Sequence, residues 1–473
     1  MSASEQLNRV FAGRWREPAL VCDERMFSYA ELHAQAAGMA AWLGAQGCGA
    51  GDSVALRLPN GWPFAVAYLA CLLGGYRIIP VNLELNADDQ DYILARTRPR
   101  LVLEDADLLA ALPPLPGEQP AFDYPANAVA AVFFTSGTTG RPKGVCHTLE
   151  ALAGNVIAFN DALGLDAETR LYHVLPMAYM AGFLNTLLSP WLSGGTVLLG
   201  PRFRPADALL FWQRPLAWNA NAIWLTPTLA AVLARMNRDA DTALRVGASL
   251  RHVFCGTAPL PVATRVAFRA AFGCPLQESY GMSEVLLVAA QTRAEAETGI
   301  GVGRLLPGVR AAFRPAPEQQ ARELVIHTPW ALAGYLLEQG EDSPLLADGG
   351  MPSGDLGEVE EGYLAITGRL KDLIIRGGLN VSPVAVEDVL LREPGIVEAA
   401  VVGLPHAFWG ESIVACLVLQ PGADAAALQT TLQARCALEL GEGMRPDRYA
   451  WLDALPRASN GKIQKYLLRE RLA

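Results

Sequence analysis

Short apolar runs alternate with longer amphipathic stretches from about residue 52 to residue 280. The short runs are rich in Val, Ile and Leu and predict strands, whereas the longer stretches repeat apolar residues at helical spacing. The predicted strands include residues 53–57, 131–134, 223–225 and 253–255, and the predicted helices include residues 150–163, 227–236 and 261–272. This alternation predicts an α/β fold with a mostly parallel sheet covered by helices.

The pattern changes after Gly299 to shorter strands and turns, which end in a strand near residues 362–369. We therefore expect a distorted β subdomain there and place a domain boundary between an N-terminal domain, residues 1–368, and a C-terminal domain, residues 369–473. In the second domain, Ser382 and Pro383 predict a helix start, because Ser is a preferred N-cap and Pro suits the first helical position. Two strands, 399–404 and 413–419, and a helix, 425–438, complete a small α+β domain.

Composition narrows the class of protein. Apolar residues make up 51% and charged residues 18% of 473 residues, which is typical of a globular chain with two or three folding units. The net charge of -10 argues against a nucleic-acid partner, which requires clustered Lys and Arg. The first 15 residues carry charges unlike a signal peptide, and the apolar stretch at 65–73 is too short to span a membrane. We expect a cytoplasmic monomer or homodimer.

Cysteine and histidine spacing predicts no structural metal. The eight cysteines are scattered singly without a C-x-x-C pair, and the six histidines are isolated in sequence. Reduced and mostly buried thiols are therefore expected, and a zinc site is not.

The segment from Thr135 to Gly144 predicts a phosphate-binding loop directly after a strand. Three glycines allow close backbone approach, hydroxyls and free N–H groups can face an anion, and Lys143 adds positive charge. A polar surface loop is the simpler alternative, but ten such residues in this order after a buried strand disfavour it. A Walker-type NTPase is excluded by spacing, since Lys143 precedes Gly144. The candidate phosphate ligands are Thr135, Ser136, Gly137, Thr138, Thr139 and Lys143.

This loop resembles the phosphate-loop signature of the adenylate-forming superfamily, which includes acyl-CoA synthetases, aryl-CoA ligases, adenylation domains and luciferases. The resemblance extends over nearly the whole chain and implies ATP and Mg²⁺. Gly256-Thr257-Ala258 resembles the turn that contacts adenine. The segment from Glu278 to Glu284 resembles the motif Y-G-x-[ST]-E.

The resemblance assigns roles to the second motif. Tyr280 is expected against the adenine, Ser283 at the α-phosphate and Glu284 on magnesium, for which a carboxylate is a suitable hard ligand. Glu278, Ser279 and Gly281 belong to the same predicted nucleotide site. Ser353-Gly354-Asp355 matches the family's [TS]-G-D segment, so Asp355 is expected to accept bonds from the ribose hydroxyls, with Arg369 reaching the ribose as well.

A competing nicotinamide fingerprint fails. Residues 299–304 read G-I-G-V-G-R, but Arg304 occupies the third glycine position, and no strand-turn-helix unit surrounds the segment.

The C-terminal motifs of the family imply a mobile domain. Lys371 occupies the hinge position, and Gly377-Gly378 would approach the thiol acceptor. Pro456–Ile463 matches the tail motif P-x-x-x-x-G-K-[IV], which makes Lys462 the predicted catalytic lysine of adenylation.

The acid and the acceptor are less defined. Tyr179 stands where many relatives have His, and with Phe183 and Ser279 it is expected to line the substrate pocket. Residues 183–191 lack the Asp of amino-acid-activating relatives, so we expect an uncharged, largely apolar carboxylic acid. Coenzyme A is the expected acceptor, and a phosphopantetheinylated acyl carrier protein is the alternative.

The sequence thus predicts an ATP-dependent carboxylic acid ligase that forms an acyl-adenylate, releases pyrophosphate and transfers the acyl group to a thiol. A non-catalytic nucleotide-binding protein on the same fold is disfavoured, because Lys143, Glu284 and Lys462 are all of the expected type. A luciferase-like oxidase that shares the adenylation step stays open.

Replacing Lys462 by Ala is expected to slow acyl-adenylate formation by roughly 10²–10³-fold, because an ammonium near the reacting anions is worth a few kcal/mol. Thiol transfer from a supplied acyl-adenylate should stay nearly unchanged. Pyrophosphate exchange and single-turnover thioester formation measure the two steps separately. An equal loss in both would contradict the assignment.

Overall fold

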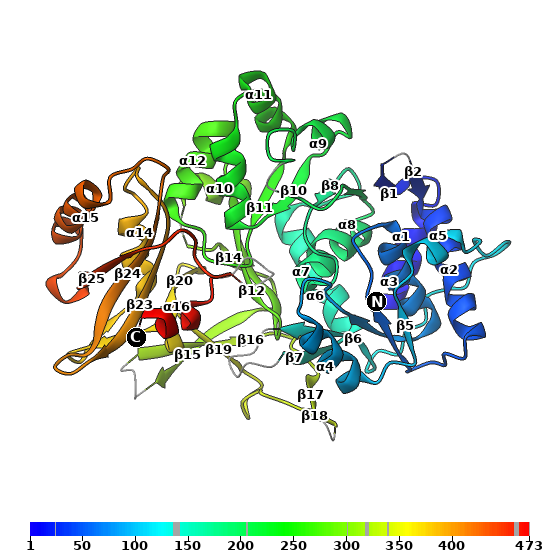
Figure 1. The fold of residues 1–473 in the computed structure, drawn as a ribbon. Helices are drawn as coiled ribbons and strands as arrows, with labels where there is room; N and C mark the ends of the chain where they lie inside the picture. Colours follow the sequence, from blue (N-terminus) through cyan, green and yellow to red (C-terminus); the bar gives the residue numbers. More distant parts are fainter. Residues whose placement is uncertain are drawn as a thin grey trace.

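The computed structural model describes residues 1–23, 25–135, 142–204, 207–299, 301–316, 321–337, 340–457 and 463–472. A large N-terminal domain carries two mixed sheets, and a smaller C-terminal domain lies beside it (Figure 1). This arrangement confirms the predicted fold class.

Within the described residues, the first sheet of the large domain has 13 strands, and its pairing changes from parallel to antiparallel about half way across. The pairs from β12 through β11, β10, β8 and β9 to β1 are parallel, and the remaining pairs are antiparallel. The parallel part is the predicted α/β sheet and the antiparallel part the predicted β subdomain. In sheet order the strands are β15 (Arg310–Ala316), β16 (Ala321–His327), β19 (Met351–Glu360), β20 (Tyr363–Arg369), β14 (Arg304–Leu305), β13 (Leu286–Ala290), β12 (Gln277–Met282), β11 (His252–Cys255), β10 (Ala222–Leu225), β8 (Arg170–His173), β9 (Thr196–Leu199), β1 (Pro18–Cys22) and β2 (Arg25–Ser28).

The second sheet has seven strands in the described part of the chain and contains the strands around the predicted phosphate loop. Strand β6 pairs parallel with β4 but antiparallel with β7, so residues 136–141 connect two arms of a hairpin. The sequence predicted one mostly parallel sheet, and this antiparallel hairpin was not predicted. In order the strands are β18 (Gly340–Asp342), β17 (Gly334–Leu337), β7 (Lys143–Thr148), β6 (Val129–Thr135), β4 (Arg77–Pro80), β3 (Ser53–Leu56) and β5 (Leu101–Leu103).

Helices cover both sheets, and α6, α10 and α12 agree with the predicted helices to within a residue. Helix α3 is buried along almost its full length, which explains its apolar sequence. No helix in the described ranges is both long and apolar enough to cross a membrane. The helices of this domain are α1 (Ala3–Gly13), α2 (Tyr29–Ala45), α3 (Trp62–Gly74), α4 (Ala87–Thr97), α5 (Ala106–Ala111), α6 (Leu149–Leu163), α7 (Met180–Phe183), a π-helix (Leu184–Leu188), α8 (Ser189–Leu192), α9 (Gln213–Ala217), α10 (Pro227–Met236), α11 (Ala240–Ser249), α12 (Val262–Phe272) and α13 (Arg293–Thr298).

The C-terminal domain is the predicted α+β unit with its own core. One cluster of buried side chains packs α14 and α15 on its sheet, and a second packs α16 on it. The described elements are β21 (Ile374–Arg376), β22 (Leu379–Val381), α14 (Pro383–Leu390), β23 (Ile396–His406), β24 (Gly410–Leu419), α15 (Ala425–Glu439), β25 (Arg448–Trp451) and α16 (Lys465–Leu472). The exact boundary at residues 368 and 369 stays a prediction.

The prediction for Ser382 is correct in position and wrong in mechanism. Ser382 is the N-cap residue of α14, but its hydroxyl makes no capping bond. It donates instead to the carbonyl oxygen of Thr367 (2.6 Å), the residue before Gly368 in strand β20. The hydroxyl therefore fastens the start of the C-terminal domain to the last strand of the large one.

Asn155 fastens α6 to the antiparallel half of the first sheet. Its side chain is fully buried, donates through Nδ2 to the carbonyl oxygen of Leu287 (2.8 Å) and accepts at Oδ1 from the Leu287 N–H (3.1 Å). One amide thus satisfies both backbone groups of a residue in β13, next to the strand that carries the Y-G motif.

Asn155→Ala is expected to lower the free energy of unfolding by about 2–6 kcal/mol, because two buried backbone groups lose their partners at about 1–3 kcal/mol each. Asp161→Ala, at an exposed position of the same helix, is the control and should change it by less than about 0.5 kcal/mol. Chemical denaturation compares the two. Equal stability of both variants would contradict a bridging role for Asn155.

Candidate active site

Strand β12 places the Y-G motif where the first sheet changes from parallel to antiparallel. Glu278 pairs with β11, whereas Ser279 and the residues after it pair with β13. Gly281 is required at the irregularity, because a Cβ there would lie 2.3 Å from the Leu286 carbonyl oxygen. Leu286 has a positive φ of 61° at the same point. The tight return of the chain brings Ser283 and Glu284 to the carboxyl edge of the parallel strands.

The predicted adenine turn contacts this motif directly. Gly256 follows β11, and a Cβ at Gly256 would lie 2.5 Å from Oγ of Ser279, so a side chain there is excluded. Thr257 adopts a φ of 73°, which is strained for a residue other than glycine, and Ala258 follows it in the same turn. The Thr257 hydroxyl is buried and has no hydrogen-bond partner among the described residues. Such strain and an unused polar atom are typical of a binding site.

Asp355 joins three of the predicted nucleotide-binding residues. The β19–β20 register places Asp355 opposite Arg369, and Nε of Arg369 lies 2.9 Å from Oδ1. The Tyr280 hydroxyl donates to Oδ2 (2.6 Å), and the Asp355 side chain is only 6% exposed. Burial raises the pKa of Tyr280 well above its usual value, and the Asp355 charge adds to that rise. The tyrosine therefore stays a donor at neutral pH.

The contact between Tyr280 and Asp355 requires a strongly curled sheet. Their strands are four steps apart in sheet order, from β12 through β13, β14 and β20 to β19. Four strand spacings would separate them by roughly 19 Å in a flat sheet, more than a tyrosine side chain can span. The antiparallel half thus folds back over the motif and closes one wall of the site.

Tyr335 is a common neighbour of Glu284, the predicted magnesium ligand, and Lys143 of the phosphate-loop motif. The Tyr335 hydroxyl donates to Oε1 of Glu284 (2.8 Å), and Nζ of Lys143 lies 5.5 Å from the centre of the Tyr335 ring. One carboxylate oxygen thus has a fixed protein partner. A carboxylate is a suitable hard ligand for Mg²⁺ bound jointly with phosphate oxygens. In the described residues, no three His, Cys, Asp or Glu side chains form a ready metal cluster.

His147 links the strand after the phosphate loop to the Y-G motif. It is fully buried in β7, and Nε2 lies 2.6 Å from the carbonyl oxygen of Ser283. Burial lowers the pKa of His147 to about 4, so the ring is neutral and Nε2 acts as a donor. The hydrogen bond fixes the strand after the phosphate loop against the Y-G motif.

The residues predicted for the substrate pocket have different surroundings. Tyr179 is partly buried, and the charges of Arg369 and Glu284 both act on its hydroxyl, while burial raises its pKa. Phe183 is buried in the core, with its ring stacked on Tyr68 (4.1 Å between centroids). Tyr179 is therefore within the electrostatic reach of two predicted nucleotide-site residues, whereas Phe183 packs in the core.

Several predicted residues lie outside the described ranges: Ser136, Gly137, Thr138, Thr139 and Lys462. The ends of both segments are described. Thr135 pairs with Lys143 at the loop end of the β6–β7 hairpin, and Arg457 pairs with Ile463 in an antiparallel bridge.

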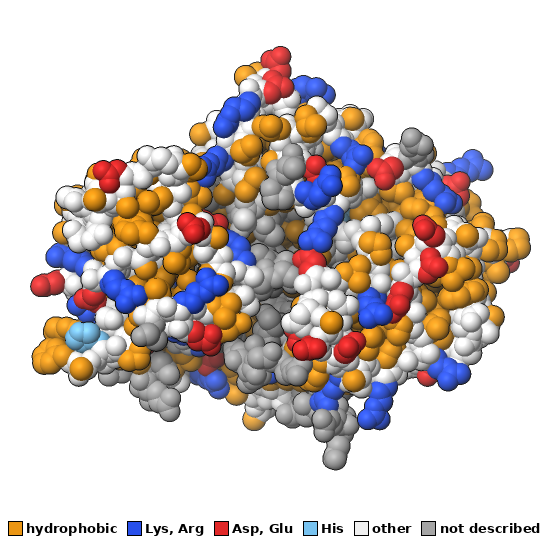
Figure 2. Space-filling view, in the orientation of Figure 1, with side chains coloured by type: hydrophobic (Ala, Val, Ile, Leu, Met, Phe, Trp, Pro, Cys, Tyr) orange, Lys and Arg blue, Asp and Glu red, His pale blue; other side chains and the backbone are white. Residues whose placement is uncertain are grey.

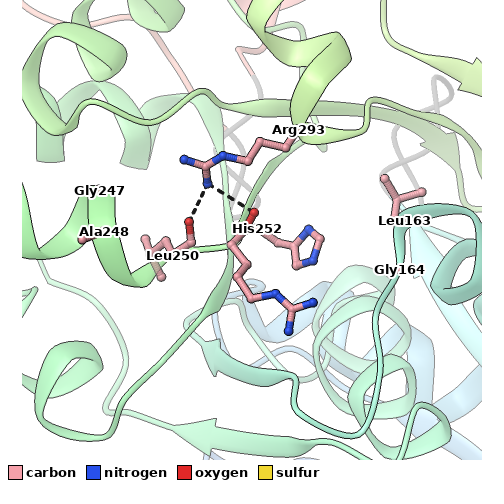
Figure 3. A pocket seen from close by; sticks show the side chains of 8 residues that line it. Leu163, Gly164, Gly247, Ala248, Leu250, His252 and Arg293 are labelled. Atoms are coloured by element: carbon pink, nitrogen blue, oxygen red, sulfur yellow. Dashed lines mark hydrogen bonds between the residues drawn. The ribbon is translucent and has the colours of Figure 1, made fainter.

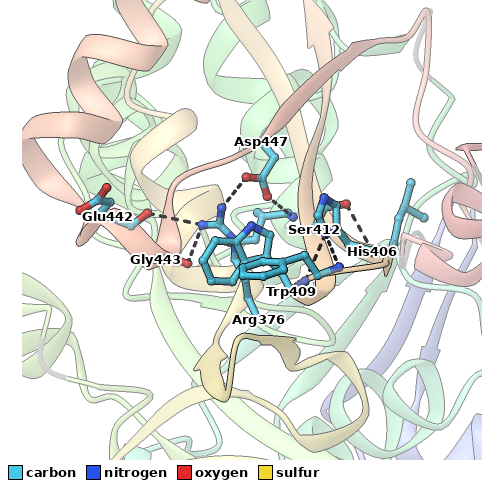
Figure 4. Close-up of polar contacts among 10 residues, drawn as sticks. Arg376, His406, Trp409, Ser412, Glu442, Gly443 and Asp447 are labelled. Carbon is cyan, nitrogen blue, oxygen red and sulfur yellow. Dashed lines mark hydrogen bonds and ion pairs between the residues drawn. The ribbon is translucent and has the colours of Figure 1, made fainter.

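The predicted acceptor loop at Gly377–Gly378 is braced by a network in the C-terminal domain. Both glycines have positive φ, and the Gly377 N–H donates to the Trp409 carbonyl oxygen (2.7 Å). Arg376 lies over the Trp409 ring, pairs with Asp447 (2.5 Å) and donates to the Gly443 carbonyl oxygen (3.2 Å), as Figure 4 shows. The β21–β22 hairpin, which carries Gly377 and Gly378, is thus held in shape within the C-terminal domain, whereas Asp355 lies in the large domain.

Two cavities lie outside the predicted nucleotide site. One of about 420 Å³ is lined by the predicted hinge residue Lys371 together with Glu411 and Arg469. Another of about 470 Å³, shown in Figure 3, opens at the amino end of β11 beside His252 and Arg293. The Gly256 turn lies at the opposite, carboxyl end of that strand, so the second cavity is not part of the candidate site.

Charged side chains of both signs share the face shown in Figure 2. On that face Lys and Arg side chains are interspersed with Asp and Glu. The only anion site that the sequence predicts is the local one at the phosphate loop.

Sequence reasoning missed Tyr335, His147 and Arg265. Tyr335 lies about fifty positions from Glu284, and no local pattern marks it. Arg265 pairs with the buried Glu278 at 2.6 Å, and the predicted helix 261–272 and the predicted motif at Glu278 gave no sign of that contact. Burial raises the pKa of Glu278 to about 7, and Arg265 opposes the rise.

Comparisons with known proteins match this geometry. A family model described as AMP-binding enzyme matches residues 8–336, and one described as AMP-binding enzyme C-terminal domain matches residues 385–462. A sulfoacetate–CoA ligase from Cupriavidus necator is 33% identical over 90% of this chain and 88% of its own length. A feruloyl-CoA synthase from Amycolatopsis sp is 31% identical over 94% of each chain. The crystal structure of ATP-bound MatB from Rhodopseudomonas palustris has a TM-score of 0.87 at 28% identity, covering 100% of this chain and 99% of the other.

Asp355→Asn is expected to raise the Kd for ATP by about tenfold to a hundredfold, because hydrogen bonds to a charged acceptor are worth about 1.5–3 kcal/mol. Calorimetry with a non-hydrolysable ATP analogue measures the change. Asp348→Asn, in an exposed turn, is the control and should bind as the natural protein does. Unchanged affinity in Asp355→Asn would rule out a ribose contact.

Proposed function

Because this chain belongs to the AMP-binding enzyme family, we propose specific roles for the residues that meet at the carboxyl edge of the parallel strands. The chain is an acid–thiol ligase of the AMP-forming acyl-CoA synthetase type, as its sequence predicted. It activates a carboxylic acid with ATP and passes the acyl group to the thiol of coenzyme A. The proposal concerns which side chains carry each step and which acids are accepted.

The observation that carries the proposal is the convergence of segments that are distant in sequence. The Gly256–Thr257 turn packs on the segment that carries Tyr280 and Glu284, Tyr280 bonds Asp355, and Glu284 and Lys143 both neighbour Tyr335. These groups offer an aromatic face, a carboxylate and an ammonium in one place. That combination suits a nucleotide, which presents adenine, ribose and phosphate together. A ligand with only one of these groups would use only one of the three protein groups.

In the first half-reaction, side chains of the Y-G motif, Asp355 and Lys143 orient the nucleotide. Tyr280 presents its ring to the adenine, and Asp355 shares its oxygens between the ribose and the protein donors Tyr280 and Arg369. Lys143 and the phosphate loop hold the β- and γ-phosphates. Glu284 would hold Mg²⁺, which neutralises phosphate charge when bound. A carboxylate oxygen of the acid attacks the α-phosphorus, the bond to the pyrophosphate oxygen breaks, and pyrophosphate leaves.

Lys462 is proposed to stabilise this step. Attack joins two anions, and an ammonium aimed at the developing charge lowers the barrier. The described ends of its segment, Arg457 and Ile463, pair with each other, and the Arg457 side chain contacts Thr228 of the large domain.

In the second half-reaction, the thiol sulfur attacks the acyl carbon and AMP leaves. Gly377–Gly378 is proposed to lie along the thiol path after the C-terminal domain has turned at Lys371. The positive φ of both glycines supports close approach to a ligand, since no side chain obstructs the backbone. Free coenzyme A is the proposed acceptor.

The acid is proposed to have an uncharged, largely apolar body. The chain from Phe183 to Leu192 contains no charged residue, and its π-helix is buried. A π-helical turn is frequent at functional sites because it redirects side chains within a helix. Tyr179 presents a protonated hydroxyl beside Arg369 and is proposed to face the reacting carboxylate.

Acid-dependent exchange of pyrophosphate into ATP tests the proposal across aromatic, medium-chain and sulfonated acids. Exchange should be strongest with an uncharged aromatic or medium-chain acid, and added coenzyme A should convert that acid to its thioester. Strong exchange with sulfoacetate alone would overturn the proposed pocket. Thioester formation on a carrier protein but not on coenzyme A would overturn the proposed acceptor.

A further inference from the structure

Arg457 joins the C-terminal domain to the large domain. Nη1 donates to Oγ1 of Thr228 in the large domain (3.3 Å), and Nη2 pairs with Oε1 of Glu398 in β23 (2.9 Å). The Arg457 and Glu398 side chains are only 27% and 26% exposed. A guanidinium is suited to this double role, because its planar fork directs separate N–H groups at two acceptors.

The point of contact lies at the edge of the nucleotide site. Thr228 is in the first turn of α10, three residues after Leu225, the last residue of β10. The Gly256 N–H donates to the Leu225 carbonyl oxygen (3.3 Å). Arg457 therefore docks one strand away from the strained turn at Thr257.

Arg457 is also one end of the segment that carries Lys462. Its backbone pairs with that of Ile463, so the two described ends of the segment lie together. A hydrogen bond from the Arg457 side chain to Thr228 thus fixes the base of this segment against the large domain.

Asp388 of α14 is influenced by the charge of the large domain. Burial raises the pKa of Asp388, and the charges of Arg392 and of Arg265 in α12 oppose that rise. Arg265 in turn pairs with Glu278, the residue before Ser279. This charge coupling therefore reaches the strand that carries the Y-G motif.

We infer that Arg457 is a positioning residue for acyl-adenylate formation, holding the base of the lysine-bearing segment at the carboxyl edge of β10 through Thr228. The inference rests on the proposed role of Lys462 in the first half-reaction. Arg457 acts through the segment that it anchors and not on the reacting atoms. Asp388 supports the same placement of the domain from α14.

The test compares Thr228→Val, Arg457→Ala and the double variant in the two half-reactions. Thr228→Val removes the acceptor and keeps the shape of the side chain, so it avoids any folding defect of the C-terminal domain. Each single variant should lower the rate of acid-dependent pyrophosphate exchange about tenfold or more, with the KM for the acid unchanged. Thioester formation from supplied acyl-adenylate should fall less than twofold, and the double variant should be no slower than Arg457→Ala.

Arg471→Ala, an exposed arginine of α16, is the matched control and should behave as the natural protein in both half-reactions. Equal losses in the two half-reactions, or multiplying losses in the double variant, would overturn the inference. These outcomes are distinct from failure of the proposed function. That failure would appear as normal pyrophosphate exchange in Lys462→Ala or as no exchange in the natural protein.

Discussion

The change of pairing along β12 is the constraint on which the candidate site depends. Its first two residues extend the parallel sheet, and the following residues turn back with β13 as an antiparallel pair. Parallel strands direct their carboxyl ends to one edge, whereas the antiparallel half curls over that edge and brings Asp355 to Tyr280. Neither half alone would place the Asp355 carboxylate beside the Tyr280 hydroxyl. Gly281 makes the change possible, because any side chain there would meet the backbone of Leu286.

Regular elements were predictable from the sequence because their signals are local. Apolar spacing and Pro at the first helical position located α10, and short β-branched runs located β10 and β11. The motifs also indicated which residues meet, since Tyr280, Asp355 and Arg369 do lie together. The roles of these residues in catalysis stay predictions.

Other features depend on tertiary contacts and have no local signal. Strand β7 pairs with β17, nearly two hundred residues away in the sequence. The hydrogen bonds of the π-helix at Leu184–Leu188 span one residue more than those of an α-helix, which an apolar pattern does not reveal. Phe183 was expected to line a pocket, but its ring stacks on Tyr68 of a helix more than a hundred residues away. Ser382 occupied the predicted cap position and still bonded across the domain boundary.

Burial of the thiols has a consequence for chemical selectivity. An acyl-adenylate is an electrophile that any accessible thiolate would consume. All eight cysteines are buried, and burial raises the pKa of Cys22, Cys274 and Cys416 to about 11. At neutral pH these three thiols are protonated and therefore poor nucleophiles. The incoming thiol thus meets no exposed cysteine of this chain as a competitor for an activated acyl group.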